Sequence, residues 1–254
     1  MSAAALRPLS IGEVLDTSFQ LYRRHFRPLA GIVLICNTVP LLLDVYVESS
    51  GGKVAHPFLG FLSAILLLVL NSIATAATVF VVSEAYLGRT MSTGDALSRA
   101  QPFVGRLIVS HILYGLLVVI GMVLLIVPGF IVLVGLALTA PALVLESIPD
   151  ATTALGRSWA LTRGARWKLV GVFVPLVILF MLPTMGAFVL VGIVVAVAGG
   201  GATIGGVFGA AIVGVLQLVF TPLVNCALTV AYYDQRVRKE GFDLEVLAGT
   251  LQPA

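Results

Sequence analysis

Long uncharged stretches of apolar residues dominate the chain. They cover 29–47, which Asp44 alone interrupts, and 58–82, 107–145, 169–198 and 207–230. A helix that crosses the hydrocarbon core of a membrane needs about 20 such residues. The stretch 107–145 is about twice that length and has Pro128-Gly129 near its middle, a pair typical of turns, so we expect two spans joined there. The pattern therefore predicts six transmembrane helices.

Shorter amphipathic segments, around 11–26, 93–104 and 151–164, precede the pairs of spans. In the first, an apolar face is opposite a charged one, and Ser10 with Glu13 forms the pattern of a capping box. The apolar face consists of Ile11, Val14, Leu15, Ser18, Phe19, Tyr22 and Phe26. A helix of this kind that leads into a span is expected to lie in the membrane interface.

The chain also repeats itself. Shifting it by 140 positions aligns 14–32 with 154–172 without a gap. The identical pairs are Leu15/Leu155, Ser18/Ser158, Leu21/Leu161, Arg23/Arg163, Leu29/Leu169 and Gly31/Gly171. We predict an all-α membrane domain, 1–254, of three parallel units at 10–87, 92–146 and 150–233, with a cytoplasmic tail at 234–254. Each unit would be an interfacial helix followed by a hairpin of two spans, related to the others by an axis along the membrane normal.

Composition and charge place this domain in lipid and orient it. Hydrophobic residues make up 59% of the chain and charged residues 11%, whereas about a quarter of the residues of a soluble domain are charged. Fourteen of the fifteen Lys and Arg residues lie on one side of the predicted spans, and only Lys53 lies on the other. This asymmetry predicts that both termini are cytoplasmic. It also explains the net charge of +3, which gives no support for a nucleic-acid partner.

Few polar residues interrupt the spans. They include Asn37, Asn71, His111, Gln217 and Asn225. Such residues either join helices by hydrogen bonds or mark a functional site. The chain has no HExxH or GxSxG motif, and its three histidines are far apart in sequence. We therefore predict no catalytic, metal-binding or cofactor-binding residues, and a packing role for Cys36 and Cys226.

Two further patterns concern partners. Gly201, Gly205 and Gly209 are spaced by four, as are Gly206, Ala210 and Gly214, and this spacing lets helices pack closely within a chain or between chains. The ladder is therefore a candidate surface for a homo-oligomer or a membrane complex. Arginines beside the interfacial helices are candidate contacts for anionic lipid headgroups: Arg23, Arg24, Arg157 and Arg163. Alternatively, these arginines pair with Glu84, Asp95, Glu146 or Asp150 and hold the bundle together.

Four stretches resemble a bacterial family of six-span proteins, the glycerophosphoryl diester phosphodiesterase membrane domain and the YciC-like inner-membrane proteins. They are SIGEVLDTSFQLYRRHF, VPGFIVLVGLALTAPALVLE, ATTALGRSWALTRGARWKLVG and ALTVAYYDQRVRKEGFDLEVL. The resemblance implies a six-span fold in the bacterial inner membrane. The family takes its name from relatives with a separate catalytic barrel after the membrane part. The 254 residues hold no such barrel, so we expect no phosphodiesterase activity.

Together these patterns predict a non-catalytic inner-membrane protein, either a scaffold or a lipid-interacting accessory subunit. The alternative is a transporter of a small solute or lipid with a polar site at the membrane midplane. An intramembrane enzyme is the third class considered. Asn71 and Gln217 discriminate between the first two, because a cavity that touches both favours the transporter.

Overall fold

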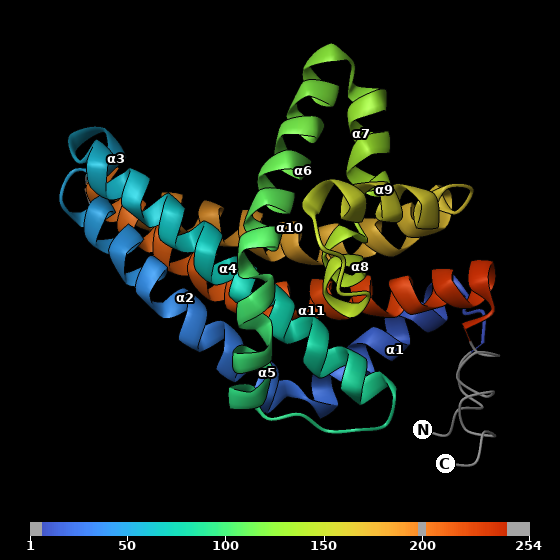
Figure 1. Ribbon diagram of the computed structural model, residues 1–254. Coiled ribbons are helices and arrows are strands. Elements are labelled where there is room, and N and C mark those ends of the chain that lie inside the picture. The colour runs from blue at the N-terminus through green and yellow to red at the C-terminus, as the bar shows by residue number, and fades with distance from the viewer. Residues whose placement is uncertain (1–6, 198–201, 243–254) are drawn as a thin grey trace.

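The computed structural model describes residues 7–197 and 202–242, and these residues form helices and turns with no strand (Figure 1). Six helical segments are long and apolar enough to cross a membrane, as predicted. The helices are α1 Ile11–Arg24, α2 Phe26–Ser49, α3 Gly52–Ala55, α4 Pro57–Tyr86, α5 Thr93–Ala100, α6 Val104–Leu124, α7 Ile126–Gly135, α8 Thr139–Leu145, α9 Ala151–Thr162, α10 Arg166–Val197 and α11 Ala202–Glu240. The predicted amphipathic segments correspond to α1, α5 and α9, and the capping box of Ser10 and Glu13 is present.

The turn between the third and fourth spans lies three residues before the predicted one. Leu125 is extended, with φ −163° and ψ 143°, and separates α6 from α7. Pro128 instead occupies the first turn of α7, where a backbone N–H has no partner within the helix and its absence costs little. The fourth span is also interrupted between α7 and α8, where the backbone carbonyl of Gly135 accepts hydrogen bonds from the hydroxyls of Ser158 (3.1 Å) and Thr162 (2.9 Å) in α9.

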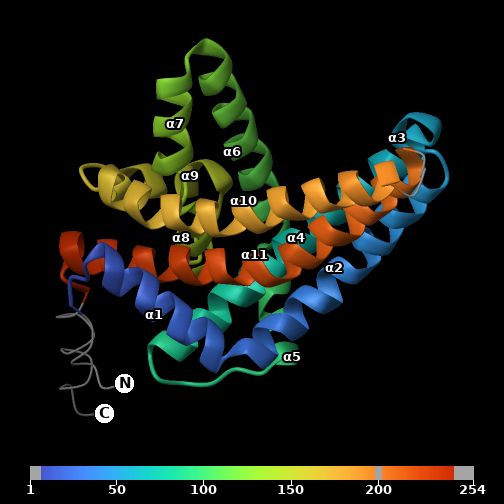
Figure 2. The same ribbon diagram turned by 180° about the vertical axis from the view of Figure 1, so that it is seen from behind.

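Each short helix packs on the pair of long helices that precedes it in the chain. Helix α5 contacts α2 and α4, and α9 contacts α6, α7 and α8. Helix α1 has no preceding pair and contacts the last one, α10 and α11, so the packing is cyclic (Figure 2). The middle of the predicted apolar face of α1 is buried in this contact, at Val14 and Ser18, whereas Phe19 and Phe26 at its edges are exposed.

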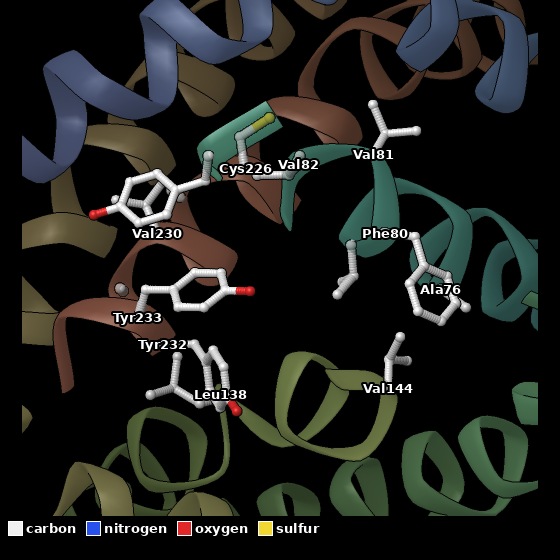
Figure 3. Close-up of a cluster of buried hydrophobic side chains, with 14 of the residues drawn as sticks. Ala76, Phe80, Val81, Val82, Leu138, Val144, Cys226, Val230, Tyr232 and Tyr233 are labelled. Carbon is white, nitrogen blue, oxygen red and sulfur yellow. The ribbon is translucent and has the colours of Figure 1, made fainter. Parts of the chain in front are cut away.

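The core lies where the second spans of the three pairs meet. Helices α4, α8 and α11 contact one another there. Figure 3 shows that side chains from all three helices contribute to this core, among them Phe80 and Val82 from α4, Val144 from α8, and Tyr232 and Tyr233 from α11. These side chains are buried, and the core they form lies near the end of the molecule that carries most of its basic residues, which we call the basic end.

The α6–α7 hairpin diverges from the other four long helices, which run side by side (Figure 1). The described part of the glycine ladder serves packing among those four. A Cβ added to Gly206 or Gly214 would meet Glu48 or Leu41 of α2, and one added to Gly209 would meet Phe188 of α10. Gly201 lies outside the described residues.

Candidate functional site: a neutral polar cleft

Four of the five polar residues predicted within the spans line one cavity of about 470 Å³. Asn71 lies at the middle of α4, His111 lies on α6, and Gln217 and Asn225 lie two helical turns apart on α11. The walls are completed by α10 and by the α7–α8 region. The volume is within the range of about 300–1,000 Å³ that is usual for small-molecule sites.

A hydrogen-bond chain orients His111. The hydroxyl of Ser72 lies 2.7 Å from the carbonyl oxygen of Leu68, one turn earlier in α4, and 3.0 Å from Nδ1 of His111. A hydroxyl has a single proton, and a carbonyl can only accept. When Ser72 donates to Leu68, Nδ1 of His111 must therefore donate to Ser72, which leaves Nε2 as an acceptor.

Two buried polar groups of the cleft have no hydrogen-bond partner within the described ranges. They are the hydroxyl of Ser110 and the side-chain amide nitrogen of Asn225. Ser110 is 1% exposed and Asn225 is 8% exposed. An unsatisfied buried donor or acceptor costs about 1–3 kcal/mol. Both residues line the cleft, but neither atom is exposed to it, so a polar group in the cavity reaches them only when the side chains rotate.

The rest of the cleft is apolar. None of the residues that line it in the described part of the chain is Asp, Glu, Lys or Arg. Aromatic and aliphatic side chains from α10 and α11 form the largest part of the wall: Phe173, Leu176, Val177, Phe180, Met181, Phe220, Val224 and Leu228. The cleft therefore combines neutral hydrogen-bonding groups with a long apolar surface.

Asn37, the fifth predicted residue, lies in another cavity of about 480 Å³ between α2 and α11. Asp44, Glu48 and Lys53 line this second cavity, and the Lys53 ammonium lies 3.3 Å from the Asp44 carboxylate. The side-chain amide of Asn37 donates to the backbone carbonyl of Val33 (3.1 Å). Gln217 lines both cavities, so its side chain stands between the cleft and this second, charged cavity.

The four arginines predicted to bind headgroups differ in their surroundings. Arg157 binds Glu146 through two guanidinium nitrogens and also binds Glu240. Hydrogen bonds with Glu240 and Glu146 raise the pKa of Arg157 above its usual value. This is the pairing that the sequence analysis held open as the alternative. Arg23, Arg24 and Arg163 are exposed, and their guanidinium groups make no ion pair with any described residue.

Sequence reasoning missed further polar residues of the site, among them Ser72, Ser110 and Tyr114. The signal was present for two of them, since Ser72 follows Asn71 and Ser110 precedes His111 in otherwise apolar runs. Tyr114 donates to the backbone carbonyl of Leu133 (3.1 Å) and ties α6 to α7. Its role depends on how the hairpin folds back, which no local pattern records.

The two cysteines are buried and unpaired in disulfides, and no group of three or more His, Cys, Asp or Glu side chains that could hold a metal ion occurs in 7–197 and 202–242. Comparison of the chain with protein-family models, with curated proteins and with solved structures gives no match. The resemblance to the six-span family therefore stays a prediction.

Proposed function

We propose that this multi-pass membrane protein binds an uncharged amphiphile, with its polar head in the cleft and its apolar part along α10. The observation that carries the proposal is the pair of unpartnered buried groups, Ser110 and Asn225, beside the acceptor nitrogen of His111. A hydroxyl or amide head group could satisfy all three once the Ser110 and Asn225 side chains rotate toward the cleft. Of the two roles expected from the sequence, a scaffold or a lipid-interacting subunit, the cleft favours the second.

The head group should be neutral because the cleft has no charge to balance an ion. Moving an unpaired charge into a low-dielectric site costs several kcal/mol, and the group would instead neutralise or stay outside. A diacylglycerol or a long-chain alcohol fits the lining, whereas a fatty acid anion or a phospholipid headgroup does not. The acyl or alkyl chain of the ligand would lie against the exposed apolar face of α10.

We also propose the three-unit architecture with its basic end in the cytoplasm. Its support is the cyclic packing of α1, α5 and α9 and a matching set of carboxylates at the ends of the second long helices. Glu84 binds Arg99 of α5, and Glu146 binds Arg157 of α9. Asp234 accepts a hydrogen bond from the backbone N–H of Leu9, two residues before α1. Each carboxylate thus fastens the next short helix.

Topology can be tested by cysteine labelling. A Lys53→Cys variant is expected to react with a membrane-impermeant maleimide added to intact cells, because α3 would face outward. Arg24→Cys, an equally exposed position at the basic end, should react only after the cells are opened. The buried native cysteines should remain unlabelled. Labelling of Arg24→Cys from outside would invert the proposed orientation.

The ligand can be tested by photo-crosslinking with a diacylglycerol that carries a diazirine in one acyl chain. Wild-type protein in detergent should give adducts on α6, α10 or α11. Asn225→Ala should weaken binding about tenfold, the equivalent of one buried hydrogen bond. Ala140→Phe should block the cleft, since Ala140 lines it.

Asn37→Ala is the matched control for this experiment, because it removes an intramembrane amide that lies outside the cleft. It should leave the crosslinking unchanged. If Asn37→Ala and Asn225→Ala reduce the yield equally, or if the adducts fall outside the lining residues, the proposed binding site is wrong.

Transport is the second candidate function, and the position of Gln217 favours it. A side chain that separates the cleft from the second, charged cavity could control passage between them. In vesicles, uptake of an uncharged polyol that disappears in Gln217→Leu would support a transporter. Diacylglycerol binding with no such uptake would support the binding role alone.

A further inference from the structure

A third cavity, of about 300 Å³, lies at the basic end and is separate from the cleft. Its apolar floor contains Phe80 and the rings of Tyr232 and Tyr233, all of which belong to the core in Figure 3. Its rim carries guanidinium groups from three segments: Arg89, Arg99 and Arg236. Cavities with a rim of arginines at the surface of a membrane protein are suited to anions, because guanidinium groups bind phosphate and carboxylate strongly.

Around Glu84, the rim of the cavity carries more positive charge than negative charge. Glu84 is the one carboxylate among the described lining residues, and it binds both Arg89 and Arg99. Two guanidinium groups therefore share a single negative charge. Glu84 is largely shielded, at 15% side-chain exposure, whereas Arg89 and Arg99 are 64% and 53% exposed and can reach a ligand at the mouth of the cavity.

The rim residues are held in place. The guanidinium of Arg99 lies over the ring of Phe80, 4.4 Å from its centroid. The hydroxyls of Ser83 and Tyr233 are 2.6 Å apart and fix the floor. Ser147, also on the lining, has φ 51° and is the one described residue other than glycine with positive φ. Such strained backbone tends to occur at functional sites.

We propose that this cavity binds the phosphate group of a ligand, with Arg89 and Arg99 as the binding residues and Glu84 as the group that occupies them when no ligand is bound. A phosphate supplies the missing negative charge and has enough oxygens to accept from two guanidinium groups at once. The phosphate could belong to a phospholipid headgroup or to a soluble molecule. The proposal does not depend on the cleft, which shares no lining residue with this cavity.

Opposite effects of two substitutions test the proposal. Arg89→Gln removes an exposed binding group and should weaken phosphate binding about tenfold. Glu84→Gln removes the competing carboxylate and should strengthen binding by a similar factor. A purely structural role for Glu84 would produce a less stable protein and no gain in affinity. Arg99→Gln provides a second loss-of-binding variant.

Two probes identify the source of the phosphate. Inorganic phosphate is titrated against the full chain in detergent at constant ionic strength, with the unfolding temperature as the readout. In parallel, native mass spectrometry measures retention of phosphatidylglycerol against phosphatidylcholine. A response to inorganic phosphate indicates a soluble ligand, and a response confined to phosphatidylglycerol indicates a headgroup.

Arg27→Gln is the matched control, because it removes an exposed arginine from the basic end that neither lines the cavity nor belongs to the candidate headgroup contacts. It should leave both readouts unchanged. Equal weakening by Arg27→Gln and Arg89→Gln would show that the basic surface attracts phosphate without a specific site, and would overturn the proposal. So would the absence of any response to either probe, or weaker binding by a folded Glu84→Gln variant.

Discussion

Asp234→Ala is expected to destabilise the protein by about 3 kcal/mol, because it removes the carboxylate of a buried ion pair and leaves the Lys168 ammonium without a negative charge beside it. The Asp234 side chain is 0% exposed and binds the Lys168 ammonium at 2.5 Å. It also accepts from the backbone N–H of Leu9 at 2.7 Å. Arg238 adds a contact at 3.1 Å, but it is 39% exposed, so solvent screens most of its contribution.

The same substitution should release α1 before the rest of the protein unfolds. Asp234 and Lys168 both bind Leu9, just before α1, and so connect α1 to α10 and α11. We expect a lower unfolding temperature in detergent together with faster tryptic cleavage at Arg23 and Arg24, which are exposed. Asp16→Ala is the control, since Asp16 is an exposed carboxylate on α1 with no ion pair to a described residue. Equal stability of the two variants would show that the buried cluster contributes little.

The spans could be predicted from the sequence because each depends on a local property, a run of apolar residues long enough to cross a membrane. The turn near Leu125 was misplaced for a local reason as well. Pro128-Gly129 fits a turn, but proline fits the first turn of a helix equally well, and the choice depends on where α6 and α7 touch. Local pattern alone does not contain that contact.

The polar residues of the cleft could be named in advance, but their convergence could not. Asn71, His111 and Asn225 each interrupt a different apolar stretch, and nothing in the sequence relates them to one another. They meet because α6 and α11 pack on α4. Likewise, Arg157 could be assigned to lipid or to Glu146 with equal reason. The approach of α9 to the end of α8 decides in favour of Glu146.

Gly129→Ala is expected to force α6 and α7 apart, because the two backbones are in contact at this point. A Cβ at position 129 would lie 2.5 Å from the backbone nitrogen of Met122, and a Cβ on Gly121 would lie 2.7 Å from Cα of Gly129. Backbone atoms cannot move aside as a flexible side chain can. We expect a loss of about 3 kcal/mol, at the upper end for an overpacked core.

Gly115→Ala is the matched control within α6, since a Cβ there would meet nothing within 4 Å. It should be neutral or slightly stabilising, because alanine favours a helix over glycine by about 1 kcal/mol. The contrast in unfolding temperature would therefore separate backbone contact from the removal of glycine as such. Similar losses in both variants would contradict the close packing of the hairpin.

The Gly129→Ala variant also tests whether the α6–α7 hairpin holds the cleft in shape. Separation of α6 from α7 should break the hydrogen bond from Tyr114 to the carbonyl of Leu133, and both residues line the cleft. Ser110 and His111 would then move relative to Asn225 on α11, and a head group could no longer reach all three. Diacylglycerol crosslinking should fall in Gly129→Ala by at least as much as in Asn225→Ala, while phosphate binding at the basic end should persist. Loss of both activities together would indicate general unfolding instead of a displaced hairpin.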